Sequence, residues 1–532
     1  MGLMERPQVT VLQDGGKFWE HEYEKFILKA YVPESEIDGK VNNYTFRAPL
    51  LLIFEEEKMS MEEEVSFAKT AGFDIIASRV DAAVFFVYPT NEGGWEKADE
   101  SMYQAIMDEV KMTPEYDDGL TEFTDRFKNE FVGYFVRGAK FRTDIYSYGK
   151  SADYVATKLL KTLNGEYLWG PGEITPAMCS MENLSVKPEL ERKDIAIISV
   201  NNREEINECF KDCENLLIKD EAEYIKDFDS FVYKFKMWCG KIEIEPNFSD
   251  YDMIEKRDFT EVKTSSDNRS EVKDQPTHKI GHMAYYNKDL FDKGPAPLLI
   301  GFHGGGDSSM YLTFVAGWWE IAHKYDFLFV SIENHQFVTP TEAITVIEDI
   351  KKKYNVDEKR IYATGFSMGS GKTWEMLQEY PSVFAGICPH SALFPMHNNP
   401  FGKSIDDGGF NTEISLPIFY SGGEKSFAPE LAFQAQSALD RIQYLATVNK
   451  LKQKFNFKVE DIPNLPNKIW GANGERTEVL HDDTRDSNMT IQYFESEDGI
   501  CRTALASIDN QIHECRQHSC ETAWKFISKF SR

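Results

Sequence analysis

Residues 360–369 read Arg-Ile-Tyr-Ala-Thr-Gly-Phe-Ser-Met-Gly, and this stretch decides the fold. An apolar, strand-like run precedes Gly365, and a helix-like run follows Gly369. A serine between two glycines at a strand-to-helix corner keeps its hydroxyl exposed on a strained turn. Glycines suit this corner because a Cβ atom there would clash with neighbouring backbone. The pattern therefore predicts that Ser367 is a nucleophile.

A second motif lies upstream of this serine. The apolar run 297–302 is typical of a buried parallel strand, and it is followed by the turn His303-Gly304-Gly305-Gly306. Such a turn leaves backbone N–H groups free to point inward, where they stabilise an oxyanion together with the N–H after the nucleophile. We expect this oxyanion hole to comprise Met368, Gly304 and Gly305. The order strand, glycine turn, strand, helix, strand, G-x-S-x-G is that of an α/β-hydrolase.

The general base is expected late in the chain, because the acid and then the histidine follow the serine in this fold. His513 lies between the strand-like run 489–494 and the amphipathic run 521–527. His518 is a close competitor that lies nearer to the final helix. We favour His513 because a longer loop can reach back over the sheet.

The acid that orients the base is expected on a loop after the strand-like run 416–421. Gly422-Gly423-Glu424 follows this run directly, so Glu424 is the preferred acid. The alternatives that stay open are Glu430, Asp482, Asp483 and Asp509.

The stretch from 281 to 532 resembles esterases of the α/β-hydrolase class that include polyhydroxybutyrate-depolymerase-like and feruloyl-esterase-like enzymes. The residues that carry the resemblance are 303–305, 360–369 and 523–526. The resemblance implies ester hydrolysis through an acyl-enzyme. The sequence departs from the family at Gly422-Gly423-Glu424, where an aspartate would be usual, and in the Cys- and His-rich loop 513–520.

The first half of the chain resembles a degenerate copy of the second. Ala48-Pro49-Leu50-Leu51 matches the run 296–299, and Ala30-Tyr31 matches 284–285. The run 145–151, which ends in Ser151, aligns with 361–367. Self-similarity at this scale predicts a repeated structural unit. The expected fold is therefore two tandem α/β-hydrolase-like lobes, each with a mostly parallel central sheet and helices on both faces. An unrelated α/β domain is the alternative for the first half.

The first lobe lacks the residues for catalysis. Its sequence has Glu55-Glu56-Glu57-Lys58 opposite the glycine turn, and carboxylates there would repel an oxyanion. No histidine occurs between His21 and His278, and a serine without a base is a poor nucleophile. We therefore expect residues 1–255 to form a non-catalytic lobe, 256–280 a charged linker and 281–532 the catalytic domain. A polar stretch at 471–486 is expected to act as a lid or substrate wall.

Composition narrows the class of partner. The net charge of −29 disfavours nucleic acid as a partner. No run approaches the roughly 20 apolar residues that cross a bilayer, and the N-terminus has no signal-like apolar segment, so we expect no membrane partner and a cytoplasmic location. Eight cysteines in 532 residues are too few for a disulfide framework. The spacing of His513, Cys515, His518 and Cys520 fits no common zinc motif, so no metal or other cofactor is expected.

These observations predict a serine carboxylesterase in which Ser367, His513 and Glu424 form the triad. Short-acyl esters, feruloyl-type esters and polyester oligomers stay open as substrates, and the sequence leaves the oligomeric state open. A serine peptidase of the same fold and a non-catalytic binding protein are the alternatives. A phosphate-binding loop at 369–373 is disfavoured, because Phe366 stands where that motif needs glycine.

Overall fold

The computed structural model divides the chain into two compact units, unit 1 from Met1 to Pro246 and unit 2 from Asn247 to Arg532. The residues that it describes are 8–34, 50–80, 82–111, 143–162, 176–190, 193, 195–213, 215–231, 234–236, 242–244, 246, 248–270, 272–305, 309, 311–333, 338–399, 402–483 and 485–532. Each unit contains its own sheet and is described by itself.

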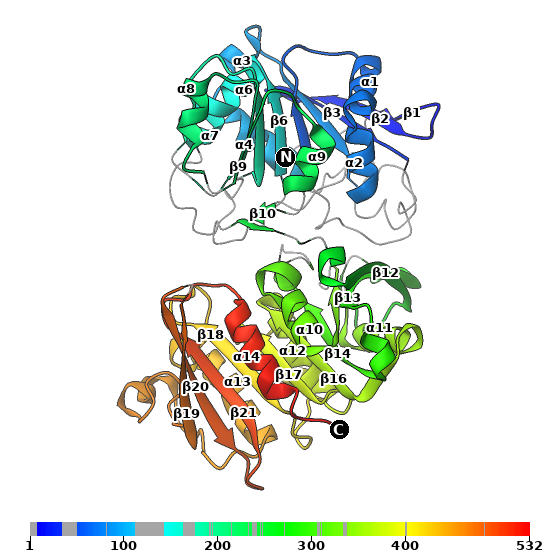
Figure 1. The fold of residues 1–532 in the computed structure, drawn as a ribbon. Coiled ribbons are helices and arrows are strands. Elements are labelled where there is room, and N and C mark those ends of the chain that lie inside the picture. The colour runs from blue at the N-terminus through cyan, green and yellow to red at the C-terminus, as the bar shows by residue number, and fades with distance from the viewer. Residues whose placement is uncertain are drawn as a thin grey trace. The chain divides into compact units, whose positions relative to one another are not determined.

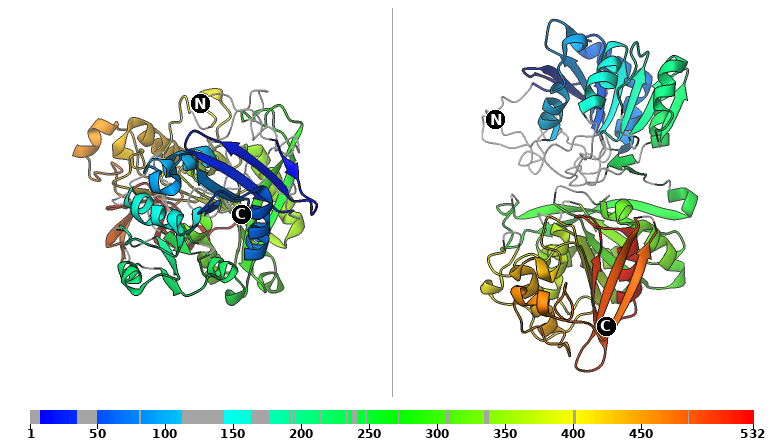
Figure 2. Two further views of the ribbon diagram at one scale, coloured as in Figure 1. Left: turned by 90° about the horizontal axis from the view of Figure 1, so that it is seen from above. Right: turned by 90° about the vertical axis from the view of Figure 1, so that its left-hand side faces the viewer.

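The sheet of unit 2 has ten strands in the order β12-β13-β15-β14-β16-β17-β18-β21-β20-β19 among the described residues (Figure 1). The run from β15 to β21 is parallel, and antiparallel strands flank it on both sides. Strands β19, β20 and β21 lie together at one edge, in orange and red in Figure 2. The strands are β12 (Met253–Lys263), β13 (Thr277–Asn287), β14 (Ala296–Phe302), β15 (Leu328–Ile332), β16 (Val356–Phe366), β17 (Gly386–His390), β18 (Ile418–Gly423), β19 (Arg476–Asp482), β20 (Ser487–Glu495) and β21 (Cys501–Ile508).

Helix α11 (Pro340–Lys353) begins where the sequence caps it. Thr339 and Glu342 form a reciprocal capping box with Pro340 at the first turn, and the last turn of the same helix carries three lysines that favour its negative end. The helices are α10 (Trp318–Tyr325), α11 (Pro340–Lys353), α12 (Met368–Glu379), α13 (Gln436–Val448) and α14 (Gln517–Ile527). None of the helices in the described part of the chain is long and apolar enough to span a membrane.

Strand β14 shows why the sheet lies between two layers. All seven of its residues are buried, as expected for a parallel strand with helices on both faces. Leu298, Ile300 and Phe302 join the core beneath α11, α12 and α13. On the opposite face of the sheet, Trp524 of α14 packs on Tyr362 of β16, with ring centroids 5.2 Å apart. The central strands are therefore fixed from both sides, which holds their carboxyl ends in place.

The sheet of unit 1 has nine strands in the order β1-β2-β3-β5-β4-β6-β7-β8-β9 in the part of the chain that is described. They are β1 (Thr10–Val11), β2 (Lys17–Glu22), β3 (Phe26–Val32), β4 (Leu50–Phe54), β5 (Val84–Pro89), β6 (Thr143–Tyr148), β7 (Met178–Glu182), β8 (Ala196–Val200) and β9 (Leu216–Lys219), with a separate pair β10 (Lys234–Lys236) and β11 (Ile242–Ile244). The helices are α1 (Met61–Ala71), α2 (Phe73–Val80), α3 (Gly94–Lys97), α4 (Met102–Lys111), α6 (Lys150–Tyr154), α7 (Leu160–Thr162), α8 (Glu204–Asn207) and α9 (Tyr224–Phe231). Two hydrophobic cores contain alternate residues of β4, so this sheet also has helices on both faces.

The two sheets share one strand order. Strands β2-β3-β5-β4-β6-β7-β8-β9 correspond one to one with β12-β13-β15-β14-β16-β17-β18-β21, and the parallel and antiparallel pairs agree. The register agrees as well, because Phe85 pairs with both Ala30 and Leu52, as Val330 pairs with both Ala284 and Ile300. The expected two α/β lobes with mostly parallel sheets are thus confirmed.

One part of the sequence match between the lobes is wrong by two residues. Leu52 pairs with Ile145, whereas the equivalent Ile300 pairs with Ala363 rather than with Ile361. The similar residue types at 145–151 and 361–367 therefore do not occupy equivalent places. Pairing across the sheet fixes the true register, and a short run of similar residues does not reveal it.

The segment 256–280 is not a linker between the lobes. Met253–Lys263 and Thr277–Asn287 form β12 and β13, which pair over their whole length. The boundary between the two units falls earlier, at Pro246. Charged residues on β12 are expected at the edge of a sheet, where they discourage pairing with another chain.

Candidate active site

Ser367 occupies the corner between β16 and α12, as the sequence predicts. Its backbone has φ 54° and ψ −116°, a conformation that non-glycine residues rarely adopt. A Cβ atom on Gly369 would lie 1.9 Å from the carbonyl oxygen of Phe302, and one on Gly365 would lie 2.1 Å from the carbonyl oxygen of Gly369. Both glycines are therefore required for the helix to approach the strands this closely, and the approach keeps the serine on its strained turn.

His513 and Glu430 complete a hydrogen-bonded chain that ends at this serine. His513 Nε2 lies 2.8 Å from Ser367 Oγ, and His513 Nδ1 lies 2.6 Å from Glu430 Oε1. The Glu430 side chain is fully buried, and its second oxygen accepts a hydrogen bond from the N–H of Gly423 at 2.6 Å. The rings of Phe366 and Phe427 contact the imidazole, with centroids 5.0 and 4.7 Å from it. The imidazole is thus held at both nitrogens and by its neighbouring rings.

The prediction that Glu424 is the acid is wrong, because Glu430 and not Glu424 contacts His513 Nδ1. Glu424 follows β18 directly, but its side chain is exposed. Partial desolvation and the nearby Asp509 carboxylate raise its pKa. Glu430 reaches His513 from the far end of the same loop. The sequence offers one signal for this choice, because Pro429 and Leu431 flank Glu430, whereas glycine and lysine flank Glu424.

The other candidates have different partners. Asp509 accepts hydrogen bonds from the backbone and side chain of Asn488, and Asp483 lies 3.5 Å from His481. Asp482 is the last residue of β19. His518 lies in the first turn of α14, where its carbonyl accepts a hydrogen bond from Thr522. The structure therefore brings together Ser367 and His513, as the sequence predicts, with Glu430 from the open alternatives.

The glycine turn after β14 lies beside the serine. A Cβ atom on Gly305 would lie 2.3 Å from Met368 Sδ, so the turn contacts the residue after the nucleophile. Burial lowers the pKa of His303 to about 4, so its imidazole is neutral. His303 Nδ1 lies 2.7 Å from the Gly304 carbonyl, and a carbonyl only accepts, so this nitrogen carries the proton. In a trans peptide the N–H opposes the carbonyl, so the Gly305 N–H points away from His303. Gly306 lies outside the described residues.

The strand order, the corner serine and the glycine turn together define the architecture. Unit 2 has the α/β-hydrolase fold. The same corner in unit 1 is occupied by Gly149, between β6 and α6, with φ 50° and ψ −116°. Ser151, which the sequence aligned with Ser367, is fully buried and donates its hydroxyl to the Phe54 carbonyl at 2.7 Å.

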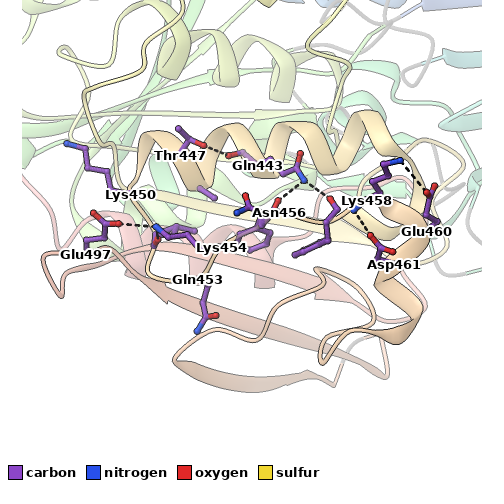
Figure 3. Close-up of a pocket in the computed structure, with 14 residues that line it drawn as sticks. Gln443, Thr447, Lys450, Gln453, Lys454, Asn456, Lys458, Glu460, Asp461 and Glu497 are labelled. Carbon is purple, nitrogen blue, oxygen red and sulfur yellow. Dashed lines mark hydrogen bonds and ion pairs between the residues drawn. The ribbon is translucent and has the colours of Figure 1, made fainter.

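A surface groove elsewhere on unit 2 is lined in part by side chains that already have partners (Figure 3). Lys454 pairs with Glu497, Lys458 pairs with Glu460, and Gln443 donates to two backbone carbonyls. None of Ser367, His513 and Glu430 lines this groove. It therefore contributes nothing to the triad.

One group of side chains in the described part of the chain brings three potential metal ligands together. Ligand atoms of His390, Cys515 and Cys520 lie within 4.8 Å of one another, and all three residues are buried. Cys515 and Cys520 lie close in sequence to His513, and the His390 carbonyl accepts a hydrogen bond from the Ser367 N–H at 3.1 Å.

Comparison with known proteins yields matches to esterases. No protein-family model matches the chain. The bifunctional acetylxylan esterase/xylanase XynS20E of Neocallimastix patriciarum is 28% identical over 137 residues, which is 24% of this chain and 19% of that protein. The match thus spans about a fifth of the length of this relative.

Solved structures of esterases and a related hydrolase also match. An acetyl xylan esterase from Aspergillus awamori aligns with 13% identity over 51% of this chain and 98% of its own, with a TM-score of 0.32. An S-formylglutathione hydrolase from Agrobacterium tumefaciens aligns with 9% identity over 54% of this chain and 98% of its own, with a TM-score of 0.31. A feruloyl esterase module from Clostridium thermocellum aligns with 11% identity over 54% of this chain and 92% of its own, with a TM-score of 0.30.

Proposed function

We propose that unit 2 is a serine carboxylesterase. The observation that carries the proposal is the hydrogen-bonded chain Glu430–His513–Ser367, which ends at a serine on a strained strand-to-helix corner. A hydroxyl needs a base within hydrogen-bond reach to become a nucleophile, and His513 Nε2 at 2.8 Å meets that requirement. Similarity to esterases in sequence and the α/β-hydrolase fold support the same reaction class.

In the proposed acylation step, Ser367 Oγ attacks the ester carbonyl while His513 Nε2 accepts its proton. The Glu430 carboxylate at Nδ1 holds the imidazole in the tautomer that leaves Nε2 able to accept, and it stabilises the charged ring. The developing oxyanion is stabilised by the N–H groups of Met368 and Gly305, with Gly304 shaping the turn. His513 then protonates the leaving alcohol.

In the proposed second step, water replaces the alcohol. His513 removes a proton from this water, which attacks the acyl carbonyl, and the proton passes to Ser367 as the acid is released. The reaction needs no cofactor, because each proton moves between Ser367, His513 and the substrate or water.

Carboxylic esters of small molecules or oligomers are the proposed substrates. Short-acyl esters deserve the first assay, because the relative with the similar segment is named an acetylxylan esterase. Feruloyl-type esters and polyester oligomers follow. A serine peptidase is the second candidate, since the same triad geometry serves amide cleavage when the leaving amine is protonated. A cytoplasmic location stays a prediction that cell fractionation would test.

Labelling with a fluorophosphonate probe tests the nucleophile directly. We expect the probe to modify Ser367, as mapped by peptide mass spectrometry, and a Ser367→Ala variant to lose labelling and hydrolysis of 4-nitrophenyl acetate together. A Ser151→Ala variant is the matched control and should keep both. Labelling at another serine, or full ester hydrolysis by Ser367→Ala, would overturn the proposal. Activity on aminoacyl-nitroanilides without activity on esters would favour the peptidase.

A further inference from the structure

The loop that carries His513 is joined to α14 by a segment with a cysteine at each end. Cys515 and Cys520 bring their sulfur atoms to 3.4 Å, and both residues are almost fully buried, with exposed fractions of 1% and 0%. A disulfide bond is about 2.05 Å long, so the two sulfurs need to approach by only about 1.4 Å. Rotation of the two thiol side chains can supply this without moving the chain far.

The backbone on both sides of the pair is held in place. The Glu514 carbonyl accepts hydrogen bonds from Ser391 Oγ at 2.7 Å and from Gln511 Nε2 at 3.2 Å. Arg516 donates to the Glu514 carboxylate and, at 2.7 Å, to Ser487 Oγ. The packing of Trp524 on Phe327 fixes α14, whose first turns contain Cys520. These contacts hold the backbone beside Cys515 and the helix that carries Cys520, so the two sulfurs stay close to each other. Such closeness is the geometric condition for a disulfide.

We propose that Cys515 and Cys520 form a reversible disulfide that ties the His513 loop to α14. Glutathione disulfide is the proposed oxidant. Because both thiols are buried, the exchange takes place when the segment 515–520 opens locally to solvent. One cysteine thiolate then attacks a sulfur of glutathione disulfide, which breaks the glutathione S–S bond, releases one glutathione thiolate and leaves a mixed disulfide. The second cysteine thiolate attacks the protein sulfur of that mixed disulfide and releases the second glutathione. The two cysteines lose two electrons, and the two released thiolates take up the two cysteine protons.

A metal ion is the competing explanation for this cluster, and the number of ligands favours it less. Structural zinc sites have four protein ligands, and the described residues supply three here. Zinc–sulfur bonds of about 2.3 Å in a tetrahedron separate two sulfurs by roughly 3.8 Å, so the 3.4 Å pair would need to open by only about 0.4 Å, and the absence of a fourth ligand among the described residues is the argument against zinc. His390 Nε2 lies 3.9 Å from Cys520 Sγ, and His390 Nδ1 contacts Ser421 Oγ at 2.7 Å.

The disulfide would act on stability more than on turnover. His513 already lies 2.8 Å from Ser367 with the two sulfurs unbonded, so oxidation does not need to move the imidazole. Closing the short segment 515–520 restricts the unfolded chain, and it keeps the loop of the base attached to α14 when the unit begins to open. We expect the thermal midpoint of unit 2 to rise by roughly 5 °C on oxidation.

The experiment treats the full-length protein with glutathione disulfide or with dithiothreitol, blocks the remaining thiols with N-ethylmaleimide under denaturing conditions, and maps peptides without reduction. The expected result is a crosslink between Cys515 and Cys520 in the oxidised sample, a mass lower by two hydrogen atoms, and a higher thermal midpoint. Cys520→Ser should lose the midpoint shift, and Cys501→Ser, on strand β21, should keep it. The wild-type protein in its two redox states gives the same comparison if Cys520→Ser fails to fold.

Three results would overturn the proposal. One is that N-ethylmaleimide modifies both cysteines fully after oxidation. Another is that glutathione stays bound to one cysteine as a mixed disulfide. The third is that the purified protein contains one equivalent of zinc, which Cys520→Ser loses and Cys501→Ser keeps. Ester hydrolysis is measured in parallel, and because the crosslink is detected by mass, its failure is distinct from failure of the esterase proposal.

Discussion

Gly149 and Ser367 have the same backbone conformation at equivalent corners of the two units, with φ 50° and ψ −116° for the glycine and φ 54° and ψ −116° for the serine. Each residue separates a central parallel strand from a helix, β6 from α6 in unit 1 and β16 from α12 in unit 2. The strained corner therefore persists in unit 1, although its residue has no side chain to act as a nucleophile.

Serine and glycine occupy opposite positions around this corner in the two units. Unit 2 has glycine, serine and glycine at 365, 367 and 369, and unit 1 has serine, glycine and serine at 147, 149 and 151. A Cβ atom on Gly149 would lie 2.2 Å from Glu56 Oε1, and this oxygen accepts a hydrogen bond from the Lys150 N–H at 3.4 Å. A carboxylate thus lies where an oxyanion would lie in an active unit, which supports a non-catalytic role for unit 1.

Ser151→Ala is expected to leave ester hydrolysis unchanged and to destabilise unit 1 by about 1–2 kcal/mol. The Ser151 hydroxyl donates to the Phe54 carbonyl at 2.7 Å and accepts from the Tyr148 N–H at 2.8 Å, and its loss leaves buried backbone groups with fewer partners. Urea unfolding followed by hydrogen exchange of peptides from unit 1 measures the change. Ser185→Ala, at an exposed position, is the control and should have a smaller effect.

Glu430→Gln is expected to lower kcat by about 10⁴-fold, with a small change in KM. A glutamine amide can donate to His513 Nδ1 and so favour the tautomer whose Nε2 carries a proton, which cannot accept the proton of Ser367. Glu424→Gln is the matched control, because the same chemical change is made on the same loop away from the imidazole. Equal losses in both variants, or a larger loss in Glu424→Gln, would contradict the assignment of the acid.

His513→Ala is expected to reduce kcat for 4-nitrophenyl acetate by about 10⁵-fold, because the serine loses its base. His518→Ala should stay close to the wild-type rate, since this residue belongs to the first turn of α14. Far-ultraviolet circular dichroism of both variants checks that they fold. Retained activity in His513→Ala together with loss in His518→Ala would reverse the assignment of the base.

The sequence predicted those features that are set by local sterics. The corner at Ser367 needs glycines on both sides, so its pattern is visible in a short stretch, and the strand and helix around it follow from periodicity. The acid depends instead on how a loop folds back over the sheet. Glu424 and Glu430 are six positions apart, and the six residues after β18 bring only the second carboxylate to His513. Tertiary packing decides this choice.

The charged strand β12 illustrates a second limit of the sequence. Eight of its eleven residues are partly or fully exposed, so its composition is that of a solvated connection. Its hydrogen bonds to β13 place it in the sheet, and those bonds depend on partner residues that lie 14 to 34 positions away in the sequence. Polar composition predicts exposure correctly here but does not distinguish an edge strand from a linker.

The buried carboxyl pair of unit 1 predicts a dependence of stability on pH. Glu55 and Glu64 are almost fully buried beside Lys29, which donates hydrogen bonds to the Glu64 carboxyl and to the Met59 carbonyl. Burial, together with the neighbouring Glu55 carboxyl, raises the pKa of Glu64 well above its ordinary value of 4.5. The folded unit therefore retains a proton that the unfolded chain releases above that value.

The sign of the effect follows from this proton. Above pH 4.5, the ordinary pKa of Glu64, the unfolded state binds fewer protons than the folded state. The stabilisation is therefore fully present below pH 4.5 and is lost as the pH rises toward the raised pKa of the folded state. One proton corresponds to a fall of about 1.4 kcal/mol in the free energy of opening for each pH unit within that window. Glu64→Gln is neutral at every pH, so it should remove most of this slope.

Hydrogen exchange of the peptide that contains β3, the strand of Lys29, measures the opening of unit 1 at about pH 6 and pH 9 after correction for intrinsic exchange. We expect wild-type protection to fall between the two values and Glu64→Gln protection to change much less. Glu62→Gln, at an exposed position on α1, is the control and should keep the wild-type slope. Identical slopes in wild type and Glu64→Gln would show that the pair holds no proton in the folded unit, and the buried Lys29 would then face two ionised carboxylates.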